Sequence, residues 1–348
     1  MSVIRRPYVW LPISLLLLGF VIWRTRPWEA AALAGSIDLI PLGLALALNA
    51  AVIALWAVRS RFLMAAVGHP LRFTELVPIV SFANTINNLT PASTGEVLRA
   101  VVLKQRHAVP YTRSGAVILV ERLWAIGIMG LTAAAAAVGP LLHAPAPIVT
   151  GAWAAAILGC FTPTVLYALG LRPGRLVRRF LERRAPAVDQ AALTVASELD
   201  VEEDLPPGPG RGRRIATAFV ELDDVLGRIV TDPAQALIFV GTTALIFLCF
   251  AVQLGLILAA LQVPLPLDAA WAALGLATIA GVVSALPFGL GATDAVLVLL
   301  LAGAGVEAAA AGATVLLLRA VVTLPLGVAG AISWTVLSRF GGAAVGAR

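Results

Sequence analysis

Long apolar stretches, each close to the length of a membrane-spanning helix, alternate along the chain with short polar loops. A helix needs roughly 20 mainly apolar residues to cross a bilayer. Six stretches reach or approach that length: 8–23, 39–58, 114–138, 148–171, 233–261 and 310–337. The stretches are continuous rather than alternating, which argues against a transmembrane β-barrel. The pattern predicts an all-α, polytopic helical membrane protein with about six full spans.

Two further apolar stretches, 75–98 and 269–304, are interrupted by polar and helix-breaking residues. The breaks are marked by Pro91 and Gly95 in the first stretch and by Pro287, Gly289 and Gly291 in the second. Non-helical backbone at membrane depth is tolerated only where protein or a water-filled cavity surrounds it. We therefore predict two broken or re-entrant helical hairpins. A single ordinary span is the alternative for the first stretch, and two short spans for the second.

Composition supports the membrane interpretation. The chain of 348 residues is 60% hydrophobic and only 13% charged, and its mean hydropathy is +0.94. A soluble domain has about 25% charged residues, so the composition excludes soluble, disordered and disulfide-stabilised proteins. Both cysteines lie inside apolar stretches and are expected to be buried small hydrophobic residues. The net charge of +6 indicates basic loops beside anionic lipid rather than binding to nucleic acid.

The basic residues also predict an orientation. Arg5 and Arg6 precede the first apolar stretch, and six arginines lie between 172 and 184. Cytoplasmic loops carry an excess of Lys and Arg. We expect both termini and the loop 172–232, with one or two surface helices, to be cytoplasmic within a single transmembrane domain over 1–348. The first apolar stretch is expected to remain as an uncleaved helix rather than a signal sequence.

The two broken stretches resemble each other. Pro91 is followed by Gly95 and Glu96, and Pro287 is followed by Gly291 and Asp294. An arginine inside the next helix lies at a matching distance, because Arg122 is 31 residues after Pro91 and Arg319 is 32 after Pro287. Broken segments at matching places in halves of opposite topology are typical of secondary transporters. We predict an inverted repeat.

Arg122 and Arg319 are the main candidates for binding. A buried arginine costs at least about 2.5–3.5 kcal/mol on insertion scales, so each needs a partner. A guanidinium binds phosphate through two parallel hydrogen bonds, which favours an anion site. The structural alternative is snorkelling or an ion pair, for Arg122 with Glu121 or with Glu96.

Glu96 also has a local interpretation. Ser93 and Glu96 fit a capping box at a helix start, and Glu96 and Arg99 are spaced as an i,i+3 pair. Thr293 is expected to cap the second half-helix in the same way, with Asp294 in its first turn. Such helix starts attract anions, so capping and function are compatible. A carboxylate at this depth is alternatively a group that couples protons.

These residues also resemble a known family. The stretch from Asn87 to Arg99, the Glu121-Arg122 pair, the stretch from Leu286 to Asp294 and Arg319 resemble the lysylphosphatidylglycerol synthase transmembrane-region family, a flippase-like membrane domain of bacteria and archaea. Family members with two domains carry a soluble aminoacyl-transferase domain after the membrane part. The resemblance implies a stand-alone lipid-translocating module in a prokaryotic plasma membrane, without that transferase.

The combined prediction is a flippase that moves an anionic or polyprenyl-linked lipid between leaflets. The predicted headgroup-binding residues are Asn87, Asn88, Glu96, Arg99, Arg122, Asp294 and Arg319. The alternatives are an integral-membrane lipid-modifying transferase and a non-catalytic partner of a lipid- or glycan-processing enzyme. The three histidines lie in separate loops and no catalytic constellation is visible, so we expect neither an enzyme nor a metal site or cofactor.

Overall fold

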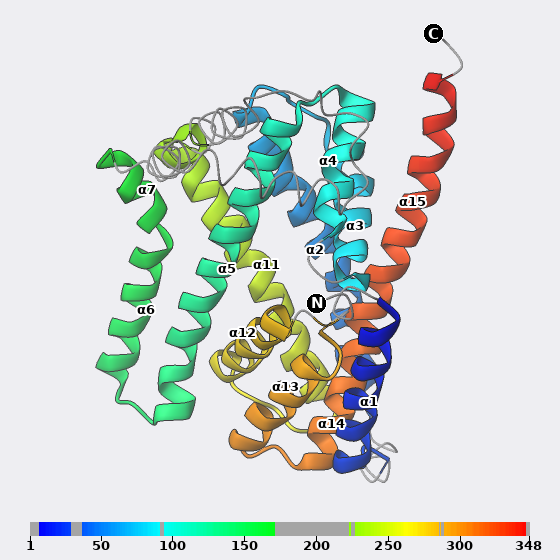
Figure 1. Cartoon of the computed structure of the whole chain (residues 1–348). Coiled ribbons are helices and arrows are strands. Elements are labelled where there is room, and N and C mark those ends of the chain that lie inside the picture. The colour runs from blue at the N-terminus through cyan, green and yellow to red at the C-terminus, as the bar shows by residue number, and fades with distance from the viewer. Residues whose placement is uncertain are drawn as a thin grey trace, which may run out of the picture.

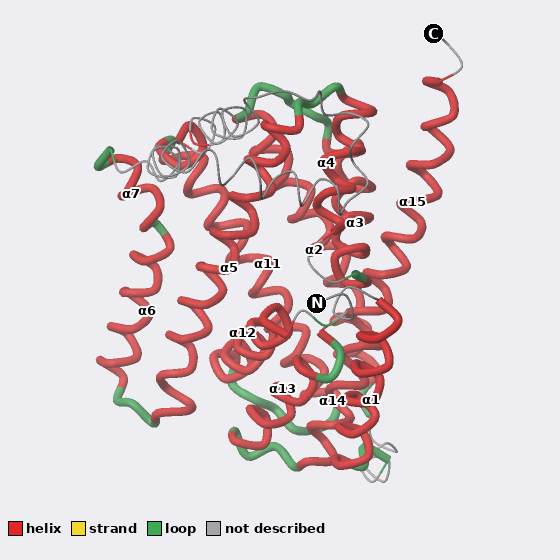
Figure 2. Tube along the Cα trace, viewed as in Figure 1, coloured by secondary structure: helices red, strands yellow, loops and turns green. Residues whose placement is uncertain are grey.

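The computed structural model is all-helical over the residues it describes, namely 7–28, 37–90, 94–170, 223, 227–284, 286 and 289–345 (Figures 1 and 2). The elements in chain order are α1 (Pro7–Thr25), α2 (Leu39–Ala66), α3 (Phe73–Leu89), α4 (Thr94–His107), α5 (Tyr111–Leu142), α6 (Ala146–Cys160), α7 (Thr162–Ala168), α11 (Pro233–Ala260), α12 (Leu267–Ser284), α13 (Ala292–Gly303), α14 (Ala308–Leu318), the π-helical turn η7 (Arg319–Thr323) and α15 (Leu324–Val345).

The prediction of a polytopic membrane protein is confirmed. Within the described part of the chain, five helices are long and apolar enough to cross a membrane. They are α2, α5 up to Gly139, α11, α12, and the continuous unit of α14, η7 and α15 up to Ser338. The bent pair α6 and α7 makes a sixth if it counts as one span. The helix α1 covers the first predicted span, 8–23, but it is not one of these five helices.

One predicted span is not straight. The stretch 148–171 was expected to form one helix, but α6 ends at Cys160 and α7 starts at Thr162, with a bend of 48° between them. Pro163 explains the break, because a proline inside a helix lacks the N–H that would bond to the carbonyl four residues earlier and its ring collides with that turn. The carbonyl concerned belongs to Gly159.

Each broken stretch forms two helices that pack on each other, α3 on α4 and α12 on α13. Each hairpin also packs on the long helix that follows the other one, so that α3 contacts α15 and α12 contacts α5, while α2 packs on α11. Small residues allow these close approaches. A side chain at Gly330 of α15 would collide with Thr85 of α3, and one at Gly275 of α12 would collide with Ala133 of α5.

The two helices of each hairpin cross closely at equivalent points. Gly95 of α4 lies against the backbone of Ala83, twelve residues earlier, and Thr293 of α13 lies against Gly281, also twelve residues earlier. In the first hairpin the glycine is on the second helix, and in the second hairpin it is on the first helix. In both cases a missing side chain lets the carboxylate-bearing helix start close to its partner.

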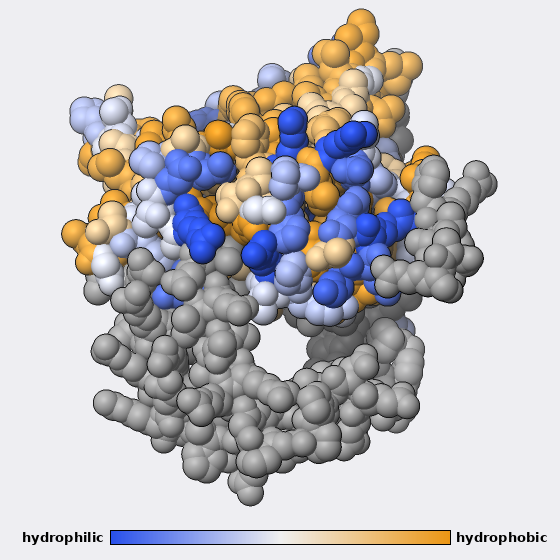
Figure 3. Space-filling model, turned by 90° about the horizontal axis from the view of Figure 1, so that it is seen from above, coloured by the Kyte–Doolittle hydropathy of each residue, from blue (hydrophilic) through white to orange (hydrophobic). Residues whose placement is uncertain are grey.

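Polar residues gather at one end of the molecule. Figure 3 shows hydrophilic residues on the end seen from above, with hydrophobic surface at the flanks. The helices α2 and α4 end, and α3 and α5 begin, at this end (Figure 1), where Arg61, Arg72, Lys104 and Arg113 are exposed. Most of the predicted loop 172–232, together with Arg5 and Arg6, lies outside the described residues.

Candidate functional site

A cavity of about 350 Å³ lies where the two halves of the chain meet. Its wall is formed by residues of α2, α3, α4, α5, α11, α12, α13, α14, η7 and α15. The apolar lining includes the aromatic residues Trp56, Phe250 and Trp271. The charged residues in the wall are Arg59, Glu96, Arg99, Glu121, Arg122 and Arg319. A largely apolar pocket with a few polar groups is the usual form of a small-ligand site.

Glu96, in the first turn of α4, binds Arg122 of α5. One carboxylate oxygen, Oε1, accepts hydrogen bonds from Arg122 Nε at 3.1 Å and Nη2 at 2.8 Å. Asn87 Nδ2 donates to the same oxygen at 2.9 Å, and the Glu96 backbone N–H donates to Asn87 Oδ1 at 3.2 Å. Of the two partners considered for Arg122, Glu96 is therefore correct and Glu121 is wrong.

Asp294, in the first turn of α13, binds Arg319 in the same manner. Its Oδ1 accepts from Arg319 Nε at 3.1 Å and Nη2 at 2.7 Å. Its Oδ2 accepts from the Gly291 backbone N–H at 2.9 Å. The predicted cap at Thr293 is wrong, because the N-cap residue is Gly291, whose φ of +83° suits a glycine, and Thr293 packs on Gly281 and Gly289 inside the hairpin.

The two arginine–carboxylate pairs match in geometry and in sequence spacing. In each pair, one carboxylate oxygen accepts from the Nε and Nη2 of the guanidinium. The two partners are 26 residues apart in the sequence in the first pair and 25 in the second. They differ in exposure. The Arg122 side chain is 37% exposed and its Glu96 partner 13%, whereas Arg319 is 19% exposed and Asp294 only 1%. Arg122 is therefore the more accessible of the two guanidinium groups.

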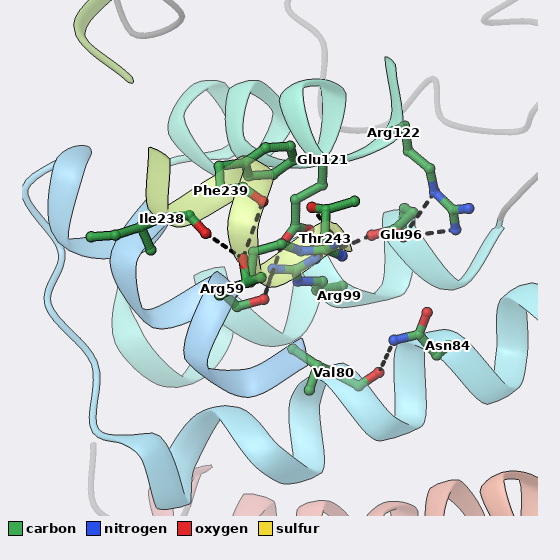
Figure 4. Close-up of polar contacts among 12 residues, drawn as sticks. Arg59, Val80, Asn84, Glu96, Arg99, Glu121, Arg122, Ile238, Phe239 and Thr243 are labelled. Atoms are coloured by element: carbon green, nitrogen blue, oxygen red, sulfur yellow. Dashed lines mark hydrogen bonds and ion pairs between the residues drawn. The ribbon is translucent and has the colours of Figure 1, made fainter. Parts of the chain in front are cut away.

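A buried ion-pair network continues inward from Glu96 (Figure 4). Arg99 Nη1 lies 3.6 Å from Glu96 Oε2 and donates to Glu121 Oε2. Arg59 Nε lies 3.7 Å from Glu121 Oε1. The charges thus alternate in the order Arg59, Glu121, Arg99, Glu96 and Arg122, and we call these five residues the charge ladder. It links α2, α4 and α5.

Ser60 of α2 fixes the inner part of the ladder. Its hydroxyl donates to Glu121 Oε1 at 3.0 Å and accepts from Arg99 Nη2 at 2.9 Å. Arg99 and Glu121 are both buried, each with a side chain 5% exposed. Because a buried charge without a partner is very costly, we expect the loss of one charge of the inner ladder to destabilise the fold.

Some polar atoms of the ladder have no hydrogen-bond partner among the described residues. They are Arg59 Nε, Arg99 Nε and Glu96 Oε2, all of which are buried. Arg59 stacks on the Phe239 ring at 5.5 Å and donates to Thr243 Oγ1 at 3.3 Å. Since nearly all buried polar groups in proteins are hydrogen-bonded, these atoms leave bonding capacity beside the cavity.

The structure brings most of the predicted site residues together. Asn87, Glu96, Arg99 and Arg122 form one connected set, Asp294 pairs with Arg319, and Asn88 lines the cavity. Of the predicted break residues, Gly95 allows the close crossing of the first hairpin, while Gly289 and Gly291 have φ of +59° and +83°. Pro91 and Pro287, and Ser93 as the predicted cap, lie outside the described residues.

Sequence reasoning did not place Arg59, Ser60 and Glu121 in the site. The apolar stretch 39–58 stops just before Arg59, but α2 continues to Ala66. A signal was present, because Arg59 and Arg61 follow the apolar stretch with no Gly or Pro between them to end the helix.

The site favours binding of an anion. Among the described residues, the four arginines Arg59, Arg99, Arg122 and Arg319 lie with the three carboxylates Glu96, Glu121 and Asp294, which leaves one positive charge in excess in this set. A single anion would balance it. Because Arg122 is partly exposed and a guanidinium has five N–H donors, it can present N–H groups to an anionic oxygen.

One family model matches the chain. The model of the lysylphosphatidylglycerol synthase TM region matches residues 9–330. This range includes both arginine–carboxylate pairs and the whole charge ladder. A comparison with curated proteins found no match.

Proposed function

The chain belongs to the lysylphosphatidylglycerol synthase TM region family, and from this membership we propose that it is a flippase for an anionic phospholipid or a polyprenyl-linked lipid. In this proposal it is a transporter rather than an enzyme, it acts in the plasma membrane of a prokaryote, and membrane lipids are its partners. The observation that carries the proposal is the cavity between the two halves, with one arginine–carboxylate pair from each half and an excess of positive charge.

In this proposal, Arg122 and Arg319 are the main residues that bind the headgroup. Both arginines line the cavity, and the guanidinium group of each is held by its carboxylate through a single oxygen. A lipid phosphate offers several strong acceptor oxygens and matches the planar fork of arginine. The N-terminal ends of α4 and α13, where the carboxylates lie, add a favourable field for an anion.

The carboxylates make the binding reversible. Glu96 and Asp294 pair with Arg122 and Arg319, so that neither of these two guanidinium groups is left without a counter-charge. An incoming phosphate competes with Glu96 for Arg122, and the carboxylate returns when the lipid leaves. Transport requires such an exchange, because a site that binds its substrate too tightly does not release it.

We propose that the chain is an inverted repeat of two units, α2 to α5 and α11 to α15. Three features support this proposal. The hairpins have the same order of break, carboxylate and arginine, the two pairs have the same geometry, and each hairpin packs on the long helix of the other unit. In such repeats, rocking of one unit against the other exposes a central site to each side in turn. The headgroup would move while the acyl chains stay in lipid.

The orientation proposed from the basic residues places both termini and the end with Arg61, Arg72, Lys104 and Arg113 in the cytoplasm. In this orientation α3 and α4 form a re-entrant hairpin that enters from the cytoplasmic side and returns to it. The exposure of these four basic residues at one end supports the assignment.

The decisive experiment measures lipid flipping per folded molecule in proteoliposomes, with a leaflet-resolved assay on anionic and polyprenyl-phosphate lipids. We expect Arg122→Gln to reduce the rate close to background, and Arg122→Lys to reduce it strongly, because lysine keeps the charge but loses the two-bond geometry. Arg319→Gln should act in the same way. Arg61→Gln, an exposed arginine at the polar end, is the matched control and should flip at the normal rate. Wild-type rates in both Arg122→Gln and Arg319→Gln would contradict the proposal.

A further inference from the structure

A second buried polar cluster lies in the apolar contact between α2, α11 and η7. It contains Asn49 of α2 and Gln253 of α11, both buried. Neither side chain lines the cavity, and the proposed exchange of anions does not use them. An uncharged amide is costly to bury without hydrogen bonds. The hydrogen-bond partners of these two side chains therefore indicate their structural role.

The partner of Asn49 is a backbone carbonyl that a proline has left without its usual bond. In a regular α-helix the N–H of residue 325 would bond to the carbonyl of Val321. Pro325 has no N–H, and Asn49 Nδ2 donates to the Val321 carbonyl at 2.7 Å instead. An asparagine on another helix thus replaces the missing donor.

The same proline lies beside a change in helix type. Residues Arg319–Thr323 form a π-helical turn, in which the Leu324 N–H bonds to the carbonyl of Arg319. A π-turn accommodates one extra residue, and π-turns occur mostly at functional sites. One residue corresponds to about 100° of rotation around the helix axis, so the turn decides which way Arg319 points relative to α15.

Gln253 holds Asn49 in the orientation that this contact needs. Its Nε2 donates to Asn49 Oδ1 at 3.2 Å and to the Ala45 carbonyl at 2.8 Å. The Asn49 carboxamide oxygen is thereby occupied, and its NH2 group faces Val321. The cluster joins α2 and α11 to the turn that carries the arginine of the second pair.

We propose that Asn49, oriented by Gln253, is a positioning residue that stabilises the π-turn and so holds the Arg319 guanidinium against Asp294. The role of Arg319 in transport rests on the proposed function, but the positioning itself does not. Arg122 lies within α5, which is α-helical from Tyr111 to Leu142. Among the described elements, a π-turn at the arginine is therefore found only in the second pair.

Two double-mutant cycles test the proposal. Unfolding is induced by SDS in mixed micelles and is measured by tryptophan fluorescence. The first combines Asn49→Leu with Pro325→Ala. Asn49→Leu alone should shift the unfolding equilibrium about tenfold towards the unfolded state, because it removes the side-chain donor to the partly buried Val321 carbonyl. In the Pro325→Ala background, where the backbone of residue 325 supplies an N–H, the same change should cost less than about threefold. Thr314→Val, which removes a buried bond within α14, is the control and should cost the same in both backgrounds. An equal cost of Asn49→Leu in both backgrounds would overturn the assignment.

The second cycle asks whether Asn49 positions Arg319 rather than only stabilising the helix. Arg319→Gln leaves the buried Asp294 without its cation and should be strongly destabilising. In the Asn49→Leu background, where the guanidinium has already moved, the added cost should be at least about fivefold smaller. Purely additive costs would show a structural role alone and overturn the positioning role. Both cycles measure unfolding, so a failure of wild-type flipping would refute the proposed function without affecting this result.

Discussion

Replacement of Glu96 by glutamine tests whether this carboxylate competes with the substrate for Arg122. The side chain keeps its size, and the amide oxygen can still accept from Asn87 Nδ2, which now lies 2.9 Å from Glu96 Oε1. The bond from the backbone N–H of residue 96 to Asn87 Oδ1 is unaffected. The change therefore removes the negative charge, which also weakens the contact of Glu96 Oε2 with Arg99 Nη1 at 3.6 Å, and leaves the hydrogen bonds at the start of α4 intact.

The expected increase in anion affinity of Glu96→Gln follows from the contacts that Arg122 loses. Glu96 Oε1 accepts two charge-assisted hydrogen bonds from Arg122. Such bonds contribute about 1.5–3 kcal/mol each when they are buried. Because Arg122 is 37% exposed, water screens the pair, and we take about 1–2 kcal/mol for the whole interaction. The loss of this competitor corresponds to anion binding that is about 5–30-fold tighter.

The assay pairs binding with transport. Titration of the purified protein with dioctanoyl-phosphatidylglycerol gives the affinity, and a leaflet-resolved assay in proteoliposomes gives the flipping rate. Glu96→Gln should bind the probe more tightly and flip more slowly, because release loses its competing carboxylate. Glu75→Gln is a matched control, since Glu75 also lies in the first turn of a helix but outside the cavity. Unchanged or weaker binding in Glu96→Gln would refute the competition.

Three further predictions concern stability and orientation. Glu121→Gln should destabilise the protein by about 3–5 kcal/mol, because it leaves the buried Arg99 short of its partner; thermal unfolding in micelles measures this, and unchanged stability would contradict a structural inner ladder. Gly330→Ala should cost about 1–3 kcal/mol in the same assay through overpacking against Thr85. Adding Thr85→Ala should recover part of that loss, and no recovery would mean that the contact does not limit the approach of α15 to α3. A single cysteine replacing Gln105, exposed between two basic residues, should react only with reagents on the cytoplasmic side, and labelling from outside intact cells would reverse the proposed orientation.

Much of the fold was predictable from the one-dimensional pattern. A backbone in lipid must satisfy its hydrogen bonds internally, so long apolar stretches have to be helices. The breaks near residues 90 and 287 were predictable because Pro and Gly lie close together there, and both are unfavourable in a helix interior. The bend between α6 and α7 was missed, because Pro163 lies inside an apolar stretch and hydropathy does not register it.

The partners of the charges were not predictable. Arg122 had two candidate partners, Glu96 and its neighbour Glu121. Adjacent residues on a helix point about 100° apart, so Glu121 turns towards Arg59 and Arg99 while Arg122 faces Glu96. The partner that each of these two side chains contacts depends on how α2 and α4 pack around α5.

The sequence by itself determined that this is a polytopic membrane protein with two broken helices, a carboxylate beside each break and an arginine in the helix that follows, because solvation and backbone geometry act on neighbouring residues. The tertiary structure alone decided that Arg122 and Arg319 line one cavity and that Asn49 reaches the carbonyl of Val321, 272 residues away. Those contacts depend on the packing of whole helices, and helix packing is set by the shapes of surfaces that no local pattern records.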